Sequence, residues 1–314
     1  MTRNQNSGLD LVPWQRVGVS LDHPMTAEEA IQRSGMDYPV EKRRLRAVMK
    51  GRLQIDVPNH FATVRMDNHR PLGVVGNRYE VVQNIDAFRF FDPLVDRSEA
   101  VYETAGVVDS GRAMWLLAKL PGYLRIGKRG DEISKYLLLV NSHDGTSQIR
   151  VRTTAIRVVC KNSLSLALQG SDELEVKIRH TANAGEKLEE AHKLLGIWNA
   201  LYQELGYILN RMAYKQVNSK QMKQFTEQLI PTNPDAENHT RTQNLRSRVL
   251  ELVETGIGAD MHKGSAFGLL NAVTELVDHQ DSSDANKALK NIFWGAGHQM
   301  KKRAFQLSEE LIKN

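Results

Sequence analysis

The chain has 314 residues, of which 41% are hydrophobic and 25% charged, the balance of an ordinary folded protein and not of a disordered one. No apolar run approaches the roughly 18 residues needed to span a bilayer, and the polar segment Met1–Asp10 lacks the apolar core of a secretory signal. Cys160 is the single cysteine, which excludes an intrachain disulfide and a cysteine-only metal cage. We therefore expect a cytoplasmic protein without a membrane partner.

The net charge is +5, and the whole basic excess lies in the first part of the chain. Residues 1–180 contain 26 Lys and Arg against 21 Asp and Glu, whereas residues 181–314 contain 16 of each kind. A basic segment beside a neutral one favours an anionic partner for the first. The alternative is that this charge only keeps the protein in solution.

Predicted elements begin with a short helix. Thr26 and Glu29 have the spacing of a capping box, which predicts a helix over residues 27–34 that stops at Gly35. Val, Ile, Leu and Thr between charged residues then predict strands over residues 44–55, 60–66 and 71–75.

A hairpin and a second helix are expected next. Gly76 and Asn77 fit a tight turn into a further strand over residues 78–82. Asn84 is predicted to cap a helix over residues 85–95.

The middle of the chain continues as strands, and the last part is helical. Strands are predicted over residues 100–108, 113–120, 136–140, 148–159 and 173–179. Turn-forming residues fill 141–145, and Asn162 or Ser163 is expected to cap a short helix through Leu168. From residue 183 apolar residues recur every three or four positions, which predicts helices over residues 183–208, 221–229, 241–254, 267–276 and 285–311.

These patterns predict an α+β fold. We expect an antiparallel sheet with short helices in a basic, nucleic-acid-binding domain of residues 1–180. A helical region of residues 181–314 is expected to pack on this domain or to mediate oligomerisation.

Common catalytic and cofactor motifs are missing from the sequence. It contains no Gly-x-x-x-x-Gly-Lys-Ser/Thr phosphate loop, no His-Glu-x-x-His, no Cys-x-x-Cys and no Gly-x-Ser-x-Gly. We therefore predict neither a catalytic residue nor a bound cofactor or metal. His143 and Asp144 could form a metal or acid–base pair, but their neighbours Asn141 and Gly145 favour a turn in which both side chains cap backbone groups. Cys160 follows a strand and is expected to be buried as a small apolar group.

Two groups of cations are candidate phosphate ligands. Six cations lie within residues 42–52, and in a strand four of them would share one face as a stripe about 25 Å long at ~3.3 Å per residue. A later strand places two arginines on one side, with a lysine just beyond its end. The candidates are Arg44, Arg46, Lys50 and Arg52 in the first group and Arg150, Arg152 and Lys161 in the second. The alternative for either group is a solvated sheet face whose cations protect an edge.

Aromatic residues are interleaved with these cations. Most are expected in the core, because they have apolar neighbours on predicted helices or strands. Tyr79, beside Arg78 at the predicted hairpin, is the candidate for stacking on a base.

Several stretches, in the same order along nearly the whole chain, resemble a phage- and plasmid-encoded family of unknown function. They are Trp14–Leu21, Arg78–Phe91, Val140–Gly145, Arg152–Leu168, Ile178–Thr181 and Asn271–His279. The resemblance implies no characterised activity. The order of elements is also similar to that of the Rad52-like annealing proteins of phages, a resemblance that implies single-stranded DNA held in a basic groove of an oligomeric ring, but that carries over no residue.

Three functions are weighed. The first is ATP-independent binding and annealing of single-stranded DNA by a homo-oligomer, with a ring expected if annealing is the function. The second is an accessory module that binds a host protein through Leu195, Trp198, Leu201 and Tyr202. The third is an enzyme with Mg²⁺ bound near Asp92, Asp96 and Glu99, which a solvated helix end explains equally well.

Overall fold

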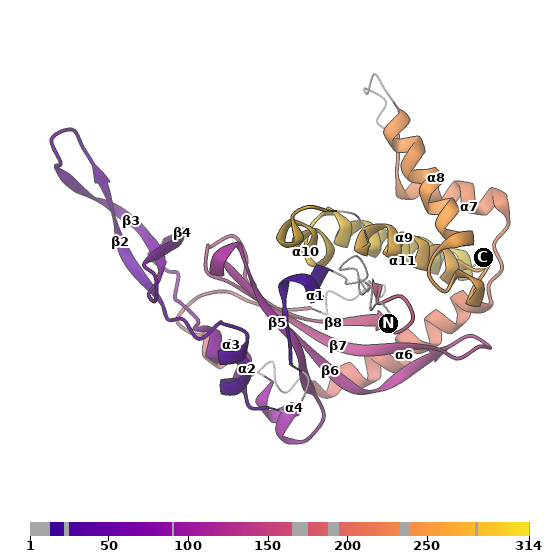
Figure 1. Cartoon of the computed structure of the whole chain (residues 1–314), viewed down its shortest axis with the longest axis horizontal. Helices are drawn as coiled ribbons and strands as arrows, with labels where there is room; N and C mark the ends of the chain where they lie inside the picture. Colours follow the sequence, from indigo (N-terminus) through magenta and orange to yellow (C-terminus); the bar gives the residue numbers. More distant parts are fainter. Residues whose placement is uncertain are drawn as a thin grey trace, which may run out of the picture.

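The computed structural model describes residues 13–21, 25–89, 91–164, 175–187, 195–232, 239–279 and 282–313. Within these residues the fold is α+β, as predicted, with two antiparallel sheets and a helical C-terminal region. A small sheet extends as an arm from the main sheet, and the C-terminal helices lie along the main sheet and at its other end (Figure 1). No described helix is both long and apolar enough to cross a membrane.

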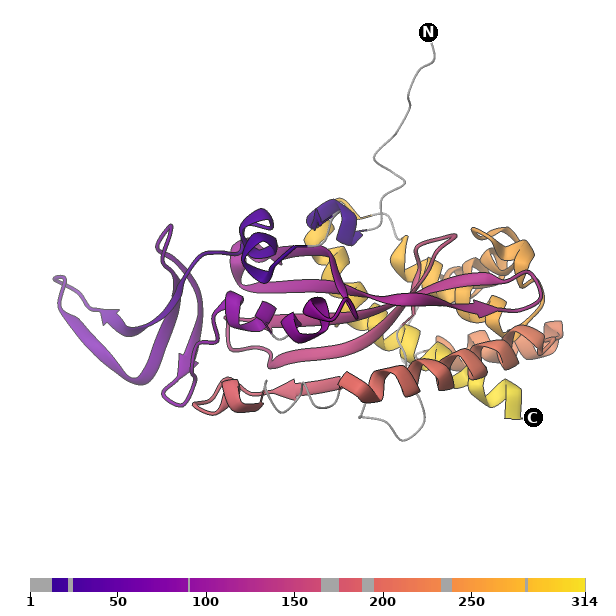
Figure 2. The same ribbon diagram turned by 90° about the horizontal axis from the view of Figure 1, so that it is seen from below.

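The small sheet consists of β2 (Val40–Val48), β3 (Gln54–Arg65) and β4 (Arg70–Gly76), paired in that order. The prediction of one strand over residues 44–55 is wrong, because the chain reverses direction between β2 and β3. Gly51 and Arg52 have φ of 83° and 67°, which make the tight turn possible. The resulting hairpin projects beyond the rest of the molecule in both views (Figures 1 and 2).

The segment after β4 also differs from its prediction. Residues 78–82 form no strand, and the Lys42 ammonium donates to the carbonyls of Asn77 and Tyr79 at 3.0 and 2.6 Å. Asn84 begins α3 (Asn84–Arg89), but its side chain makes tertiary hydrogen bonds and does not cap the helix.

The helix expected over residues 85–95 is divided into α3 and α4 (Asp92–Asp96). Pro93 lies in the first turn of α4, where its missing N–H is tolerated, but it cannot continue a helix from α3. Upstream, α2 (Ala27–Arg33) has the predicted capping box between Thr26 and Glu29.

The main sheet has strand order β1-β5-β6-β7-β8-β10, with β9 paired to β8, and every described pairing is antiparallel. Its strands are β1 (Val19–Ser20), β5 (Val101–Val108), β6 (Ala113–Ile126), β7 (Asp131–Ser142), β8 (Ile149–Arg157), β9 (Ser163–Leu164) and β10 (Glu175–Ile178). The helix predicted from residue 163 is wrong at its start, where Ser163 and Leu164 pair with β8 as β9, and residues 165–168 lie outside the described part.

Both faces of the central strands are buried, so their side chains alternate between two cores. On one face Trp115 and Leu138 pack with Trp14 of α1 (Pro13–Val17) and Phe293 of α10 (Ala285–Phe293). On the opposite face the cluster joins the sheet to α2, α3 and α6 (Leu195–Tyr214). Helices thus sandwich the sheet, which fixes where it remains accessible.

The C-terminal helices pack on one another and on the sheet. They are α6, α7 (Ser219–Leu229), α8 (Thr240–Thr255), α9 (Ala266–Asp278), α10 and α11 (Ala296–Lys313). The continuous helix predicted over residues 285–311 is interrupted at Trp294 and Gly295. Trp198 and Tyr202 of α6 are buried, and the Tyr202 hydroxyl donates to the carbonyls of β7 and β8, so these two residues are not a free partner surface.

Buried polar contacts fasten the helices to the sheet. The Lys301 ammonium of α11 lies 2.6 Å from the Asp278 carboxylate of α9 and donates to the Ser163 hydroxyl of β9 at 2.7 Å. All three side chains are buried. Cys160 is also buried, as predicted, and burial raises the pKa of its thiol to about 11.

We expect Lys301→Met to reduce the free energy of unfolding by about 3–5 kcal/mol, because it leaves the Asp278 carboxylate buried without its cation. The double variant Asp278→Leu/Lys301→Met should recover part of this loss, since no charge is then stranded. Urea unfolding followed by circular dichroism measures both. Equal losses in the single and double variants would contradict the ion-pair explanation.

Candidate functional site

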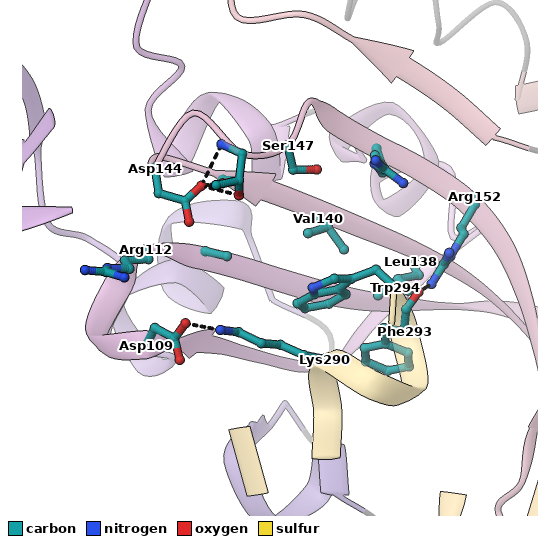
Figure 3. Close-up of a pocket in the computed structure, with 14 residues that line it drawn as sticks. Asp109, Arg112, Leu138, Val140, Asp144, Ser147, Arg152, Lys290, Phe293 and Trp294 are labelled. Atoms are coloured by element: carbon teal, nitrogen blue, oxygen red, sulfur yellow. Dashed lines mark hydrogen bonds and ion pairs between the residues drawn. The ribbon is translucent and has the colours of Figure 1, made fainter. Parts of the chain in front are cut away.

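A cationic groove, composed of two adjoining cavities, lies where α10 ends over the main sheet. The first cavity, of about 320 Å³, is lined by Asp109, Arg112, Ala113, Leu138, Val140, Ser142, Asp144, Thr146, Ser147, Arg150, Arg152, Lys290, Phe293 and Trp294 (Figure 3). The second is lined by Arg78, Tyr79, Gly145, Thr146, Ser147, Gln148, Arg150, Lys177, Arg179, His180 and Thr181. Seven Lys and Arg side chains and two carboxylates therefore line the groove.

The first cavity exists because α10 stops before it covers the whole sheet. Trp294 leaves the helical conformation at φ −149°, and the chain restarts as α11 at Ala296. The sheet face under this break carries Leu138 and Val140 of β7 and the two arginines paired beside them on β8. The Trp294 ring extends from the helix end into this space, between Lys290 and Val140 (Figure 3).

Arg152 holds the end of α10 in place. Its guanidinium donates to the Phe293 carbonyl and to His298 Nε2, the latter at 2.9 Å. A cation at a helix C-terminus complements the helix dipole and the unpaired carbonyls there. Burial lowers the pKa of Arg152 to about 10, still far above neutral pH. Arg152 thus lines the cavity, but its donors bind the end of α10, and its role as a phosphate ligand stays a prediction.

Arg150 lies at the junction of the two cavities, opposite another cation. It pairs across the strands with Lys177 of β10, a like-charge arrangement that is unfavourable by itself. Glu175 offsets it in part, with its carboxylate 3.6 Å from Arg150 and 3.1 Å from Lys177. Beyond β10, Arg179 adds a further exposed cation. This surface therefore attracts anions.

The loop between β7 and β8 borders both cavities and is held by hydrogen bonds. The Asp144 carboxylate accepts from the Ser142 hydroxyl and from the Thr146 backbone N–H, at 2.5 and 2.9 Å. The Thr63 hydroxyl of the small sheet donates to the His143 carbonyl at 2.6 Å. Asp144 therefore caps a backbone group, as predicted, whereas the buried His143 ring contacts the Asn84 side chain at 2.7 Å and caps no backbone group. The loop presents the hydroxyls of Thr146 and Ser147 to the groove.

Tyr79 borders the second cavity, but one face of its ring is occupied. His180 stacks on it with centroids 4.7 Å apart and planes 17° apart, and the Tyr79 hydroxyl donates to the Ser142 carbonyl. Burial raises the pKa of Tyr79. The prediction that Tyr79 stacks on a base therefore stays untested, and only the ring face away from His180 could serve it. Both ring nitrogens of the buried His180 have no hydrogen-bond partner among the described residues.

The other predicted site residues lie outside the groove. Arg44 and Arg46 extend from β2 beside Asp56, at 3.4 and 2.8 Å from its carboxylate. Lys50 and Arg52 lie in the turn after β2, so the expected four-residue stripe on one strand does not form.

Lys161 follows β8 at the end opposite to Arg150 and donates to Gln15 at 3.3 Å. Only Arg150, Arg152 and Tyr79 of the predicted residues meet in the groove.

Sequence reasoning missed most of the groove. Lys177 and Arg179 lie two apart in a predicted strand and could have been noticed by this spacing. Arg112 and Lys290 carry no local signal. Trp294 was hidden because its segment was predicted as uninterrupted helix.

No group of three or more His, Cys, Asp or Glu with metal-binding geometry occurs among the residues that the structure describes. Asp92, one of the predicted acidic cluster, accepts a hydrogen bond from the Tyr102 hydroxyl at 2.9 Å.

Comparison with known families gives one match. The family model described as a domain of unknown function (DUF932) matches residues 71–303, so the chain belongs to this uncharacterised family. All residues that line the groove lie within the matched segment, whereas β2 and β3 precede it. No curated protein and no solved structure matches the chain. The phage or plasmid origin and the likeness to annealing proteins stay predictions.

The buried histidines His143 and His180 should make the free energy of unfolding depend on pH. Burial lowers the pKa of His180 to about 4. Burial and the positive charge of a protonated His180 together lower the pKa of His143 to about 3. In an unfolded chain both pKa values are near 6.5. The unfolded state thus binds more protons below about pH 6.5, so stability is fully present above that pH and is lost toward pH 4. In His180→Gln the urea midpoint of unfolding should fall less steeply between pH 6.5 and pH 4 than in wild type. In the control His69→Asn, where the histidine is exposed, the midpoint should follow the wild-type profile. Identical pH profiles for wild type and His180→Gln would disprove the burial effect.

Proposed function

We propose that this DUF932 protein binds single-stranded DNA in the cationic groove and anneals strands without ATP. The observation that carries the proposal is the lining of the two cavities around a half-buried tryptophan. Arg152 binds the end of α10 and Lys290 pairs with Asp109, which leaves five cations against one further carboxylate, Asp144. Such a combination of positive charge and an aromatic platform is what single-strand binding requires.

Phosphate recognition would be carried by the cations that the fold leaves accessible. Arg78, Arg112, Lys177 and Arg179 are exposed, and Arg150 is half-buried between the two cavities. The like-charge pairing of Arg150 and Lys177 costs stability in the free protein, and a bound phosphate would relieve it. These contacts carry no sequence information, so binding should be sequence-tolerant.

Base recognition is supported by the first cavity. Trp294 lies there beside apolar Val140 and Leu138, with the Ser142 and Ser147 hydroxyls nearby as polar partners. A volume of about 320 Å³ suits a single small ligand group such as one nucleotide.

Single strands are favoured over duplex by the same geometry, because the bases of a duplex are stacked inside it and cannot reach a recessed tryptophan. Annealing would follow when phosphate contacts hold a strand extended and leave neighbouring bases free to pair. A cytoplasmic, phage- or plasmid-type setting belongs to this proposal. Binding to a host protein through α6 has less support, since Trp198 and Tyr202 are buried.

The phosphate contacts can be tested by salt dependence. Arg150→Gln/Arg179→Gln should weaken binding to a labelled single strand and make the plot of log affinity against log salt shallower by about 1.4, at about 0.7 per lost contact. Arg125→Gln/Arg303→Gln is the matched control, because both arginines pair with glutamates outside the groove. Fluorescence anisotropy measures both slopes. Absence of wild-type binding at low salt would refute the proposal and favour a protein partner.

The stacking contact can be tested by tryptophan fluorescence. Trp14, Trp115 and Trp198 are buried, so quenching by a single strand should come from Trp294. Trp294→Leu should abolish this quenching and weaken binding by about 1–3 kcal/mol. Trp14→Phe should retain the quenching. Quenching that persists in Trp294→Leu would exclude Trp294 as the platform.

A further inference from the structure

The tip of the β2–β3 hairpin is an apolar surface without a partner in the described molecule. Every residue from Arg46 to Asp56 is exposed, and we call this segment the hairpin tip. It presents four large apolar side chains to solvent: Val48 (71% exposed), Met49 (51%), Leu53 (62%) and Ile55 (49%). Exposed apolar clusters of this kind mark interaction sites in soluble proteins.

The chemistry of the tip favours a protein over a nucleic acid. Lys50 and Arg52 lie between Met49 and Leu53, but no aromatic ring occurs between Arg46 and Asp56 on which an unpaired base could stack. Arg46 is already engaged by Asp56 at 2.8 Å. The complementary surface is therefore a cavity with an apolar floor and an acidic rim.

The same chain has such a cavity, formed by α2, α3 and α4. It is lined by Met25, Thr26, Ala27, Glu28, Glu29, Arg89, Asp92, Val95 and Asp96, and we call it the acidic cavity. Four carboxylates and one guanidinium line it, and its apolar lining comes from the half-buried Val95 and from the small accessible part of Met25, which is 6% exposed. Glu28 uses Arg89 as its ion partner at 3.0 Å, which leaves an excess of negative charge on the rim.

The tip cannot reach the acidic cavity of its own chain. β2 runs nine residues outward from the body of the protein, or about 30 Å at ~3.3 Å per residue. The hairpin points away from α2 and α4 in both views (Figures 1 and 2). Only a second copy can bring the two surfaces together.

We propose that the hairpin tip of one copy docks in the acidic cavity of a second copy. Met49 and Leu53 would contact the Met25 and Val95 surface, and Lys50 and Arg52 would face the rim carboxylates. Because the two surfaces differ, the contact is head-to-tail, and repetition closes a ring or extends a filament. The groove is separate from both surfaces, so the inference does not rest on the proposed DNA binding.

The test is the mass of the nucleic-acid-free, full-length protein by analytical ultracentrifugation over a concentration series. Wild type should associate, and rising salt should weaken the association because opposite charges are screened. Lys50→Glu/Arg52→Glu and Glu28→Lys/Asp96→Lys should each dissociate it, with an association on the order of tenfold weaker or more. Lys128→Glu/Arg129→Glu, an equal charge reversal in the β6–β7 turn, is the matched control and should behave as wild type.

Mixing Lys50→Glu/Arg52→Glu with Glu28→Lys/Asp96→Lys shows whether each variant has lost only its docking surface or has misfolded. Each variant retains one intact surface, so the mixture should re-form complexes that contain both. A wild-type protein that stays monomeric at every concentration overturns the proposal, as does a mixture that fails to associate. Hairpin variants that keep the wild-type mass but lose affinity for single-stranded DNA also overturn it and assign the tip to nucleic acid.

Discussion

The end of α10 is the constraint on which the groove depends. Arg152 rises from β8 and binds the Phe293 carbonyl and His298, so the last turn of the helix is fixed over one point of the sheet. Were α10 to continue, its side chains would cover the outward face of β7 and β8. Because it stops, Trp294 is placed over an uncovered stretch of sheet that is bordered by cations. One half-buried arginine thus links the helical region to the site that the sheet presents.

The electrostatics of the groove go against the stability of the free protein. Arg150 of β8 and Lys177 of β10 are paired on neighbouring strands, and their like charges are offset only in part by the carboxylate of Glu175, which lies near both. Buried pairs elsewhere are better matched: Lys301 meets Asp278, and Arg157 meets Asp131 at 2.5 Å. The contrast supports the proposal of an anionic ligand for the groove, since a surface with excess positive charge gains most from one.

Charged residues therefore have three different roles in three different parts of this molecule. Buried ion pairs join the helices to the sheet, the groove concentrates exposed cations around an aromatic ring, and the hairpin tip combines cations with aliphatic side chains. The groove and the hairpin tip suit different proposed partners. The groove offers an aromatic ring on which a base could stack, whereas the hairpin tip offers aliphatic side chains that could contact the apolar lining of an acidic cavity. The match to the family model includes every residue that lines the groove but begins after β3, so the groove lies inside the matched segment and the hairpin tip lies outside it.

Local patterns in the sequence determined the class of fold and many elements, because capping and periodicity act within a few residues. Thr26 and Glu29 form their capping box, strands occur where residues 100–108, 113–120, 136–140 and 148–159 predicted them, and Cys160 is buried. Tertiary structure decided the rest. The reversal at Gly51 splits the expected cationic strand, Asn84 bonds to distant Met36 and His143, and His180 covers Tyr79. Arg112, Arg150, Lys177 and Trp294 come together only through strand pairing and helix packing, contacts between residues far apart in the chain that no local pattern records.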